Sequence, residues 1–261
     1  ITNSGELDMR FFKKELSGKT KLIALTHISN SLGTINPIEE IIELTHQTDA
    51  KILIDGAQAA AHAKLDVQKL DVDFYCFSAH KLYGPTGVGV LYGKEELLNM
   101  LPPYQGGGEM IKDVSIHKTT YAELPHKFEA GTPNIAGVIA FKKAIDFIKE
   151  VGVENMKEHE DLLLNYATLK LEEIPNLSII GTAPKKSGII SFVVSEIHHY
   201  DLGLILDKLG VAIRTGHHCT QPVMKKMNIS GTSRISFACY NTKAELDYTV
   251  DCIKKAIKML S

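Results

Sequence analysis

Short apolar runs alternate with longer segments of helical periodicity through the first half of the chain. Four runs predict strands, because each holds several hydrophobic residues bounded by polar or turn-forming ones: residues 21–29, 51–55, 73–78 and 87–93. After the first run, Pro37 opens a segment with apolar residues at helical spacing, and proline at a helix start loses no internal hydrogen bond. Such alternation is typical of βαβ units, so we expect an α/β sheet.

The pattern changes between residues 102 and 135. This stretch has three consecutive glycines, several prolines and little periodicity, so it predicts long connecting loops. A helical pattern from Ile135 to Val151 then leads into the second part of the chain.

The second half mixes both periodicities. Helical patterns cover residues 155–174, 201–209 and 243–260, and apolar runs that predict strands cover residues 176–181, 187–194, 210–215 and 233–239. We expect a partial large α/β domain at residues 1–146, followed by a small C-terminal α+β domain at residues 147–261.

Composition indicates a globular protein and argues against two kinds of partner. The chain has 261 residues, of which 44% are hydrophobic, enough to form substantial cores. The formal net charge is −2 and the charges are interspersed, so the basic surface that nucleic acid requires is not expected. No apolar run approaches the ~20 residues that a membrane-spanning helix needs. We therefore expect neither nucleic acid nor a membrane as a partner.

Four cysteines differ in their surroundings. They show no paired metal-site spacing and no dense disulfide framework, which fits a reducing compartment, and we expect the cytoplasm. Cys76 lies in an apolar run and Cys252 in a helical pattern, so both are expected in the core. Cys219 lies in a polar loop, where a thiol can be reactive.

Two histidines precede Cys219. His217, His218 and Cys219 are not expected to bind zinc, because consecutive residues rarely converge on one tetrahedral metal ion. A neighbouring histidine that favours the thiolate is the better interpretation.

Lys81 follows an apolar run, residues 73–78, and leads into a glycine-rich turn. A lysine amine can form a Schiff base with a carbonyl cofactor, most commonly pyridoxal phosphate. That cofactor needs a carboxylate against its ring nitrogen. Asp55 offers one, because it ends an apolar run and open α/β sheets bind ligands at the carboxyl ends of their strands. A solvated lysine and a turn-forming aspartate are the ordinary alternatives.

Two arginines flank the later motifs. Arg234 stands at the start of an apolar run, where an unpaired guanidinium is costly to bury, so it is expected to bind an anion. A substrate α-carboxylate suits its planar donors, and an internal salt bridge is the alternative. Arg214 opens the cysteine loop and could orient the substrate or stabilise a thiolate.

Three motifs occur in order along the chain: Asp-x-x-Gln at 55–58, Ser-x-His-Lys at 78–81 and Arg-Thr-Gly-His-His-Cys at 214–219. With them the chain resembles the class V aminotransferases and, within that family, the cysteine desulfurases. The short loop at residues 214–222 is similar to that of the Suf-type and selenocysteine lyase-like group. The resemblance implies the aspartate aminotransferase-like fold of pyridoxal phosphate-dependent transferases, fold type I. Part of the large α/β sheet domain would precede the small C-terminal domain, which carries the cysteine loop.

The resemblance also implies residue roles. Lys81 would hold pyridoxal 5'-phosphate as a Schiff base and move protons at the substrate α-carbon, and Cys219 would be the catalytic thiol. Thr132 would contact the phosphate held by the other subunit of a homodimer. The remaining cofactor contacts are implied for the ring partners Asn30, Asp55 and Gln58 and the phosphate donors Ser78 and His80. Substrate contacts are implied for Asn30, Arg214 and Arg234.

These roles imply a cysteine desulfurase that converts L-cysteine to L-alanine and leaves a persulfide on Cys219. Its sulfur would pass to a small acceptor protein of iron–sulfur cluster assembly. Two alternatives stay open: a selenocysteine lyase, which shares every motif, and an inactive truncated scaffold. The second arises because the chain starts without methionine, within the expected large domain. The turn that cradles the phosphate and the histidine that stacks on the ring are therefore expected outside these residues.

Overall fold

Two four-stranded sheets and a two-stranded hairpin make up the β structure of the computed structural model, which describes residues 1–261. The first sheet has the order β1-β2-β3-β4, with β1, β2 and β3 parallel and β4 antiparallel to β3. Its strands are β1 (Leu22–Thr26), β2 (Lys51–Asp55), β3 (Phe74–Ser78) and β4 (Gly89–Gly93). Each lies within one of the four predicted runs, so the α/β sheet is confirmed.

Helix α2 (Ile38–His46) covers one face of this sheet. Its buried isoleucines, such as Ile41, pack against Ile52 and Ile54 of β2, which are fully buried. Pro37, predicted to open this helix in its first turn, stands at the N-cap position, directly before the first helical residue. The remaining short helices of this part are α1 (Met9–Glu15), α3 (Ala59–His62), α4 (Val67–Leu70) and α5 (Glu95–Met100).

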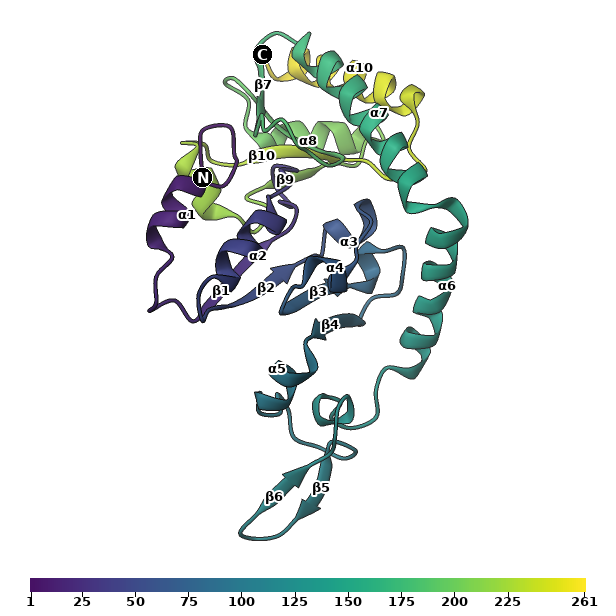
Figure 1. Ribbon diagram of the computed structural model, residues 1–261. Coiled ribbons are helices and arrows are strands. Elements are labelled where there is room, and N and C mark those ends of the chain that lie inside the picture. Colours follow the sequence, from purple (N-terminus) through teal and green to yellow (C-terminus); the bar gives the residue numbers. More distant parts are fainter.

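Two long helices connect this sheet to the second one. Helix α6 (Ile135–Val151) has the predicted bounds and packs through Phe141 against Ala79 and Leu82, at the end of β3. It meets α7 (Val153–Glu172) at Gly152, whose φ of +87° suits glycine. Figure 1 shows α6 running along one side of the molecule towards α7, which lies over the second sheet.

The second sheet is antiparallel, with the order β7-β8-β10-β9. Its strands are β7 (Leu177–Ile180), β8 (Ile189–Val194), β9 (Arg214–Gly216) and β10 (Thr232–Ser236). Its core of 18 buried residues draws on the sheet and on three helices, α7, α8 (His199–Lys208) and α10 (Lys243–Leu260). A short helix, α9 (Gln221–Lys226), follows the cysteine loop. This matches the expected α+β arrangement.

Two expectations about local structure were wrong. Only Arg214 and Thr215 of the predicted strand at residues 210–215 lie in a strand, because pairing with β10 begins at Arg214. Residues 102–135 contain a hairpin of β5 (Ile111–Val114) and β6 (Thr119–Tyr121), with a 3₁₀ helix, η2 (His126–Phe128), after it. The hairpin projects away from both larger sheets (Figure 1), so most of its side chains are exposed and no hydrophobic alternation marks it.

The domain division at residue 146 stays a prediction. Helix α6 spans that position, and the Thr182 N–H donates to the Ser4 carbonyl at 2.9 Å, so contacts join the two predicted domains. None of the helices is both long and apolar enough to cross a membrane.

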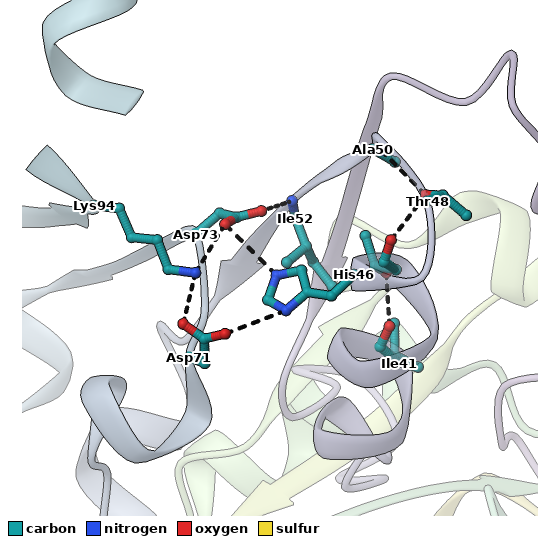
Figure 2. Close-up of polar contacts among 9 residues, drawn as sticks. Ile41, His46, Thr48, Ala50, Ile52, Asp71, Asp73 and Lys94 are labelled. Atoms are coloured by element: carbon teal, nitrogen blue, oxygen red, sulfur yellow. Dashed lines mark hydrogen bonds and ion pairs between the residues drawn. The ribbon is translucent and has the colours of Figure 1, made fainter. Parts of the chain in front are cut away.

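A buried polar network fixes the amino ends of β2 and β3 (Figure 2). The Asp73 carboxylate is 2% exposed and accepts a hydrogen bond from the Ile52 N–H at 3.0 Å. Lys94 Nζ lies 3.3 Å and His46 Nε2 3.6 Å from its other oxygen. Asp71 binds the same two partners from the surface, at 2.6 Å and 3.4 Å. The network ties α2, β2, β3 and β4 together at the edge opposite the carboxyl ends of β2 and β3.

We expect Asp73→Asn to lower the free energy of unfolding by about 3 kcal/mol, because it takes the charge from a buried carboxylate whose partners stay in place. Asp71→Asn is the matched control, since it removes an exposed carboxylate of the same network, and its effect is expected to stay below about 1 kcal/mol. Urea denaturation of the three proteins measures both effects. Equal losses in the two variants would contradict this account of the network.

Candidate active site

Three predicted site residues lie at the carboxyl ends of β2 and β3. Asp55 ends β2 and pairs in register with Cys76 of β3, so Ser78, at the end of β3, lies just beyond it along the same edge. The chain then forms a 3₁₀ turn, η1 (Ala79–Lys81), at whose end Lys81 is exposed. The structure thus brings Asp55, Ser78 and Lys81 to one sheet edge, where α/β proteins bind ligands.

The turn after Asp55 packs against the ring of Tyr75, which in turn contacts His27. A Cβ on Gly56 would lie 1.9 Å from the Tyr75 ring, so only glycine allows this close approach. The Tyr75 hydroxyl lies 3.0 Å from His27 Nδ1. Burial lowers the pKa of His27 to about 4, so this ring is neutral near pH 7. Asp55 Oδ1 accepts from the Ala57 N–H at 2.9 Å, which orients the carboxylate.

Gln58 and His80 lie beside these residues in the chain. Gln58 is half-buried at the start of α3, and His80 is exposed in η1. Neither side chain forms a hydrogen bond within the protein, so their polar atoms are free to contact a ligand.

Asn30 connects this part of the chain to the second sheet. Its side-chain amide donates to the His218 carbonyl at 2.7 Å, and its own carbonyl accepts from Arg234 Nη1 at 2.7 Å. Asn30 follows β1, whose last residue, Thr26, pairs with Asp55. Asn30 therefore contacts both the cysteine loop and Arg234, close to the first sheet.

The cysteine loop follows β9 and presents its thiol to solvent. Cys219 is exposed, and Arg214 Nη2 lies 3.8 Å from its Sγ. His218 and Cys219 have φ angles of +53° and +62°, which turn the chain sharply at the thiol. The loop borders a hollow of about 460 Å³ lined mainly by polar residues of the segment 214–222. The Arg214 guanidinium thus lies beside the thiol of Cys219.

Arg234 has a donor free for an anion. Its guanidinium is half-buried and forms no ion pair with Asp or Glu, so the alternative of an internal salt bridge is wrong. Its Nε is buried without a hydrogen-bond partner. Burial, and then the nearby Arg214 charge, lower the pKa of Arg234 from its ordinary value. An anionic group bound here would relieve both costs.

His218 acts as an anchor that the sequence did not indicate. It is 2% exposed, and its Nε2 lies 2.8 Å from Thr232 Oγ1 on β10. Burial, and then the Arg234 charge, lower the pKa of His218 to about 4. It is therefore neutral near pH 7, and the predicted help of a histidine to the thiolate does not come from it. His217, by contrast, is exposed.

Acid is expected to weaken this anchor. The pKa of His218 is about 4 when folded and 6.5 ordinarily, so the unfolded chain binds more protons between these values, and stability falls as the pH drops through that window. His27 contributes in the same window. We expect His218→Asn to reduce the slope of unfolding free energy against pH from 6.5 to 4, and His217→Asn, which removes an exposed ring, is the matched control. Urea denaturation across this pH range measures the slopes. Equal slopes in the wild type and both variants would contradict the role of His218 as an anchor of the cysteine loop.

Other predicted positions lie apart from these groups. Thr132 is exposed in the loop before α6 and shares no hydrogen bond with the other predicted residues. Cys252 is buried, as expected, whereas Cys76 is only half-buried at the sheet edge beside Asp55.

Comparisons with known proteins point in one direction. The chain matches the aminotransferase class-V family over residues 1–249. A cysteine desulfurase of Dickeya dadantii (strain 3937) is 47% identical over 261 residues, which cover 100% of this chain and 63% of that protein. The chain thus spans less than two thirds of the length of this relative.

Two solved structures share the fold. One is the cysteine desulfurase CsdA (S-sulfonic acid) of Escherichia coli, with a TM-score of 0.93 and 37% identity over 97% of this chain and 63% of that one. The other is the apo cysteine desulfurase of Thermococcus onnurineus NA1, with a TM-score of 0.94 and 37% identity over 99% of this chain and 65% of that one.

Proposed function

Because this chain belongs to the aminotransferase class-V family, we propose that the whole protein is a pyridoxal phosphate-dependent cysteine desulfurase. It converts L-cysteine to L-alanine and leaves a persulfide on Cys219. One observation carries the proposal: an exposed cysteine, with Arg214 beside its Sγ, lies in a loop that Asn30 ties to the first sheet. Ordinary transamination has no use for such a thiol.

The residues at the sheet edge fit the cofactor. Asp55 supplies a fixed carboxylate for the ring nitrogen, and the exposed Lys81 supplies an amine for the aldehyde carbon. Gln58 would contact the ring oxygen, and Ser78 and His80, whose side chains have no partner in the protein, would donate to the phosphate. Bound there, pyridoxal phosphate supplies an electron sink for the bonds around the substrate α-carbon.

The chain's own residues bind the substrate and move its protons. Arg234 takes the α-carboxylate through its free donors, and Asn30 holds Arg234 in place. The Lys81 amine would remove the proton from the substrate α-carbon and later return one.

The sulfur transfer takes place at Cys219. The thiolate, stabilised by Arg214, attacks the sulfur of the bound cysteine. The new bond joins the two sulfur atoms, and the bond between the substrate sulfur and its β-carbon breaks. The electron pair of that bond stays with the carbon fragment, which takes up a proton to become alanine. The persulfide remains on the protein.

Partners follow from the same exposed thiol. We infer that a small sulfur-acceptor protein of iron–sulfur cluster assembly removes the persulfide sulfur by attack of its own thiolate. We also infer a homodimer, in which the exposed Thr132 reaches the phosphate held by the other subunit. The four cysteines are unpaired, which fits a cytoplasmic location.

Alanine release from L-cysteine by the full-length, cofactor-loaded protein tests the proposed activity. We expect steady turnover when a reducing thiol is present to clear the persulfide. Absence of alanine with spectroscopically confirmed cofactor would refute the activity.

A further inference from the structure

A buried ion pair joins the two parts of the candidate site away from Asn30. His62 Nδ1, at the end of α3, lies 2.6 Å from Glu160 Oε2 on α7. Helix α3 begins directly after Gln58 at the edge of the first sheet, whereas α7 packs on the core of the second sheet. The pair therefore links α3, at the sheet edge where we propose that the cofactor binds, to α7, in the second part of the chain, which also carries the cysteine loop.

This pair is buried enough to resist separation. Glu160 is 2% exposed, and the His62 side chain 15%. The other carboxylate oxygen, Oε1, is buried and has no hydrogen-bond partner. Removing His62 would leave this carboxylate buried with no partner at all, which costs far more than breaking a surface ion pair.

Aromatic contacts lie next to the pair and involve the lysine turn. Tyr83, two residues after Lys81, packs edge-on against two aromatic rings. Its ring centroid lies 5.5 Å from that of Phe147 of α6 and 6.5 Å from that of Tyr240. Burial and then the adjacent Cys239 raise the pKa of the Tyr83 phenol. Cys239 and Tyr240 follow β10, the strand that carries Arg234. The lysine turn is thus packed against the exit of the substrate-binding strand.

Several hydrogen bonds already join the first 36 residues to the second sheet, among them the Ser187 N–H to the Gly33 carbonyl at 2.8 Å and the Ser191 hydroxyl to the Ser31 carbonyl. The Glu160–His62 pair adds an attachment between two other elements, α3 and α7, and so further restricts the motion of α3 relative to the second sheet. We propose that Glu160 and His62 are positioning residues that hold Cys219 and Arg234 in register with Lys81 and Asp55. The inference rests on the proposed function, because it assumes that these four residues act on one substrate.

The test compares Glu160→Ala with Glu160→Gln in the full-length, cofactor-loaded protein. Loss of the pair should displace Cys219 and Arg234 relative to Lys81 and Asp55 while leaving each of these two groups intact. Small misplacements of reacting groups cost about ten- to a hundredfold in rate. For Glu160→Ala we expect kcat for alanine formation to fall at least about tenfold. Cofactor affinity and the rate of Cys219 alkylation by iodoacetamide should stay at wild-type values. Glu160→Gln should restore most of kcat, because its amide oxygen still accepts from His62.

Asp73→Asn is the matched control, since it removes another buried carboxylate that lies within the first sheet alone. It should lower stability without lowering kcat. If Glu160→Ala does not fold, His62→Ala takes its place with the same expectations. Wild-type kcat in the alanine variant, or an equal loss of kcat in Asp73→Asn, would overturn the inference.

Hydrogen–deuterium exchange separates this inference from the proposed function. Amides of α3 and of residues 238–241 should exchange faster in Glu160→Ala, and not in Asp73→Asn, whether or not the protein turns over cysteine. Unchanged exchange at these two segments would overturn the positioning role even in an active enzyme. Faster exchange in a protein that makes no alanine would support the role of the Glu160–His62 pair in attaching α3 to α7. The same result would refute the proposed desulfurase activity instead.

Discussion

Lys81→Ala is expected to abolish covalent cofactor binding and to lower alanine formation by more than about a thousandfold. The exposed amine at the end of η1 is the group we assign to the aldehyde carbon of the cofactor. The same amine moves protons at the substrate α-carbon, and such proton transfer contributes about 10²–10⁴-fold to rates. A visible absorption spectrum of the full-length protein with pyridoxal phosphate measures attachment, and an alanine assay measures turnover.

Lys69→Ala controls for the loss of a lysine as such, because Lys69 is an exposed lysine of α4 that forms no ion pair. It should keep both the absorption band and the activity. A Lys81→Ala protein that retains the band of a covalently held cofactor would show that another amine holds it, and the assignment of Lys81 would fall.

Cys219→Ala is expected to lower alanine formation from L-cysteine by more than about a hundredfold, since it removes the nucleophile of the sulfur-transfer step. Cofactor binding should be unaffected, because Cys219 lies in the second part of the site, where the hollow beside it is lined by residues of the segment 214–222. The measurement pairs an alanine assay with the absorption spectrum of the bound cofactor.

Selenocysteine gives this variant an internal comparison. Selenium leaves its carbon more readily than sulfur, so its elimination depends less on an attacking thiolate. We expect Cys219→Ala to retain much more activity on selenocysteine than on cysteine. A wild-type protein that acts on selenocysteine alone would favour the selenocysteine lyase alternative, and Cys252→Ala serves as the control for loss of a cysteine outside the site.

Elements with a complete local signal could be predicted from the sequence. Helix α10 has the predicted bounds because Thr242 and Glu245 form a capping box directly before its apolar face. Helix α6 ends where Gly152 supplies a positive φ. The candidate residues at the ends of β2 and β3 were also predictable, because an apolar run that ends in Asp55 or Ser78 places that residue at the carboxyl edge.

Contacts between distant segments could not be predicted in this way. Asn30 bonds to residues 188 and 204 positions further along the chain, and no local pattern marks such a partner. His218 has the appearance of a polar loop residue, yet it turns inward to Thr232. Glu160 lies in a strongly charged stretch of α7, and only the packing of α3 against that helix reveals that this one carboxylate is buried.

Mass spectrometry of Cys219 after a single turnover tests the central claim most directly. The full-length, cofactor-loaded protein would be mixed with one equivalent of L-cysteine in the absence of any other thiol, and then digested under non-reducing conditions. We predict that the peptide with Cys219 gains the mass of one sulfur atom, in an amount equal to the L-alanine formed. Alanine formed without added sulfur on Cys219, or with the added sulfur on Cys76, Cys239 or Cys252 instead, would contradict the account.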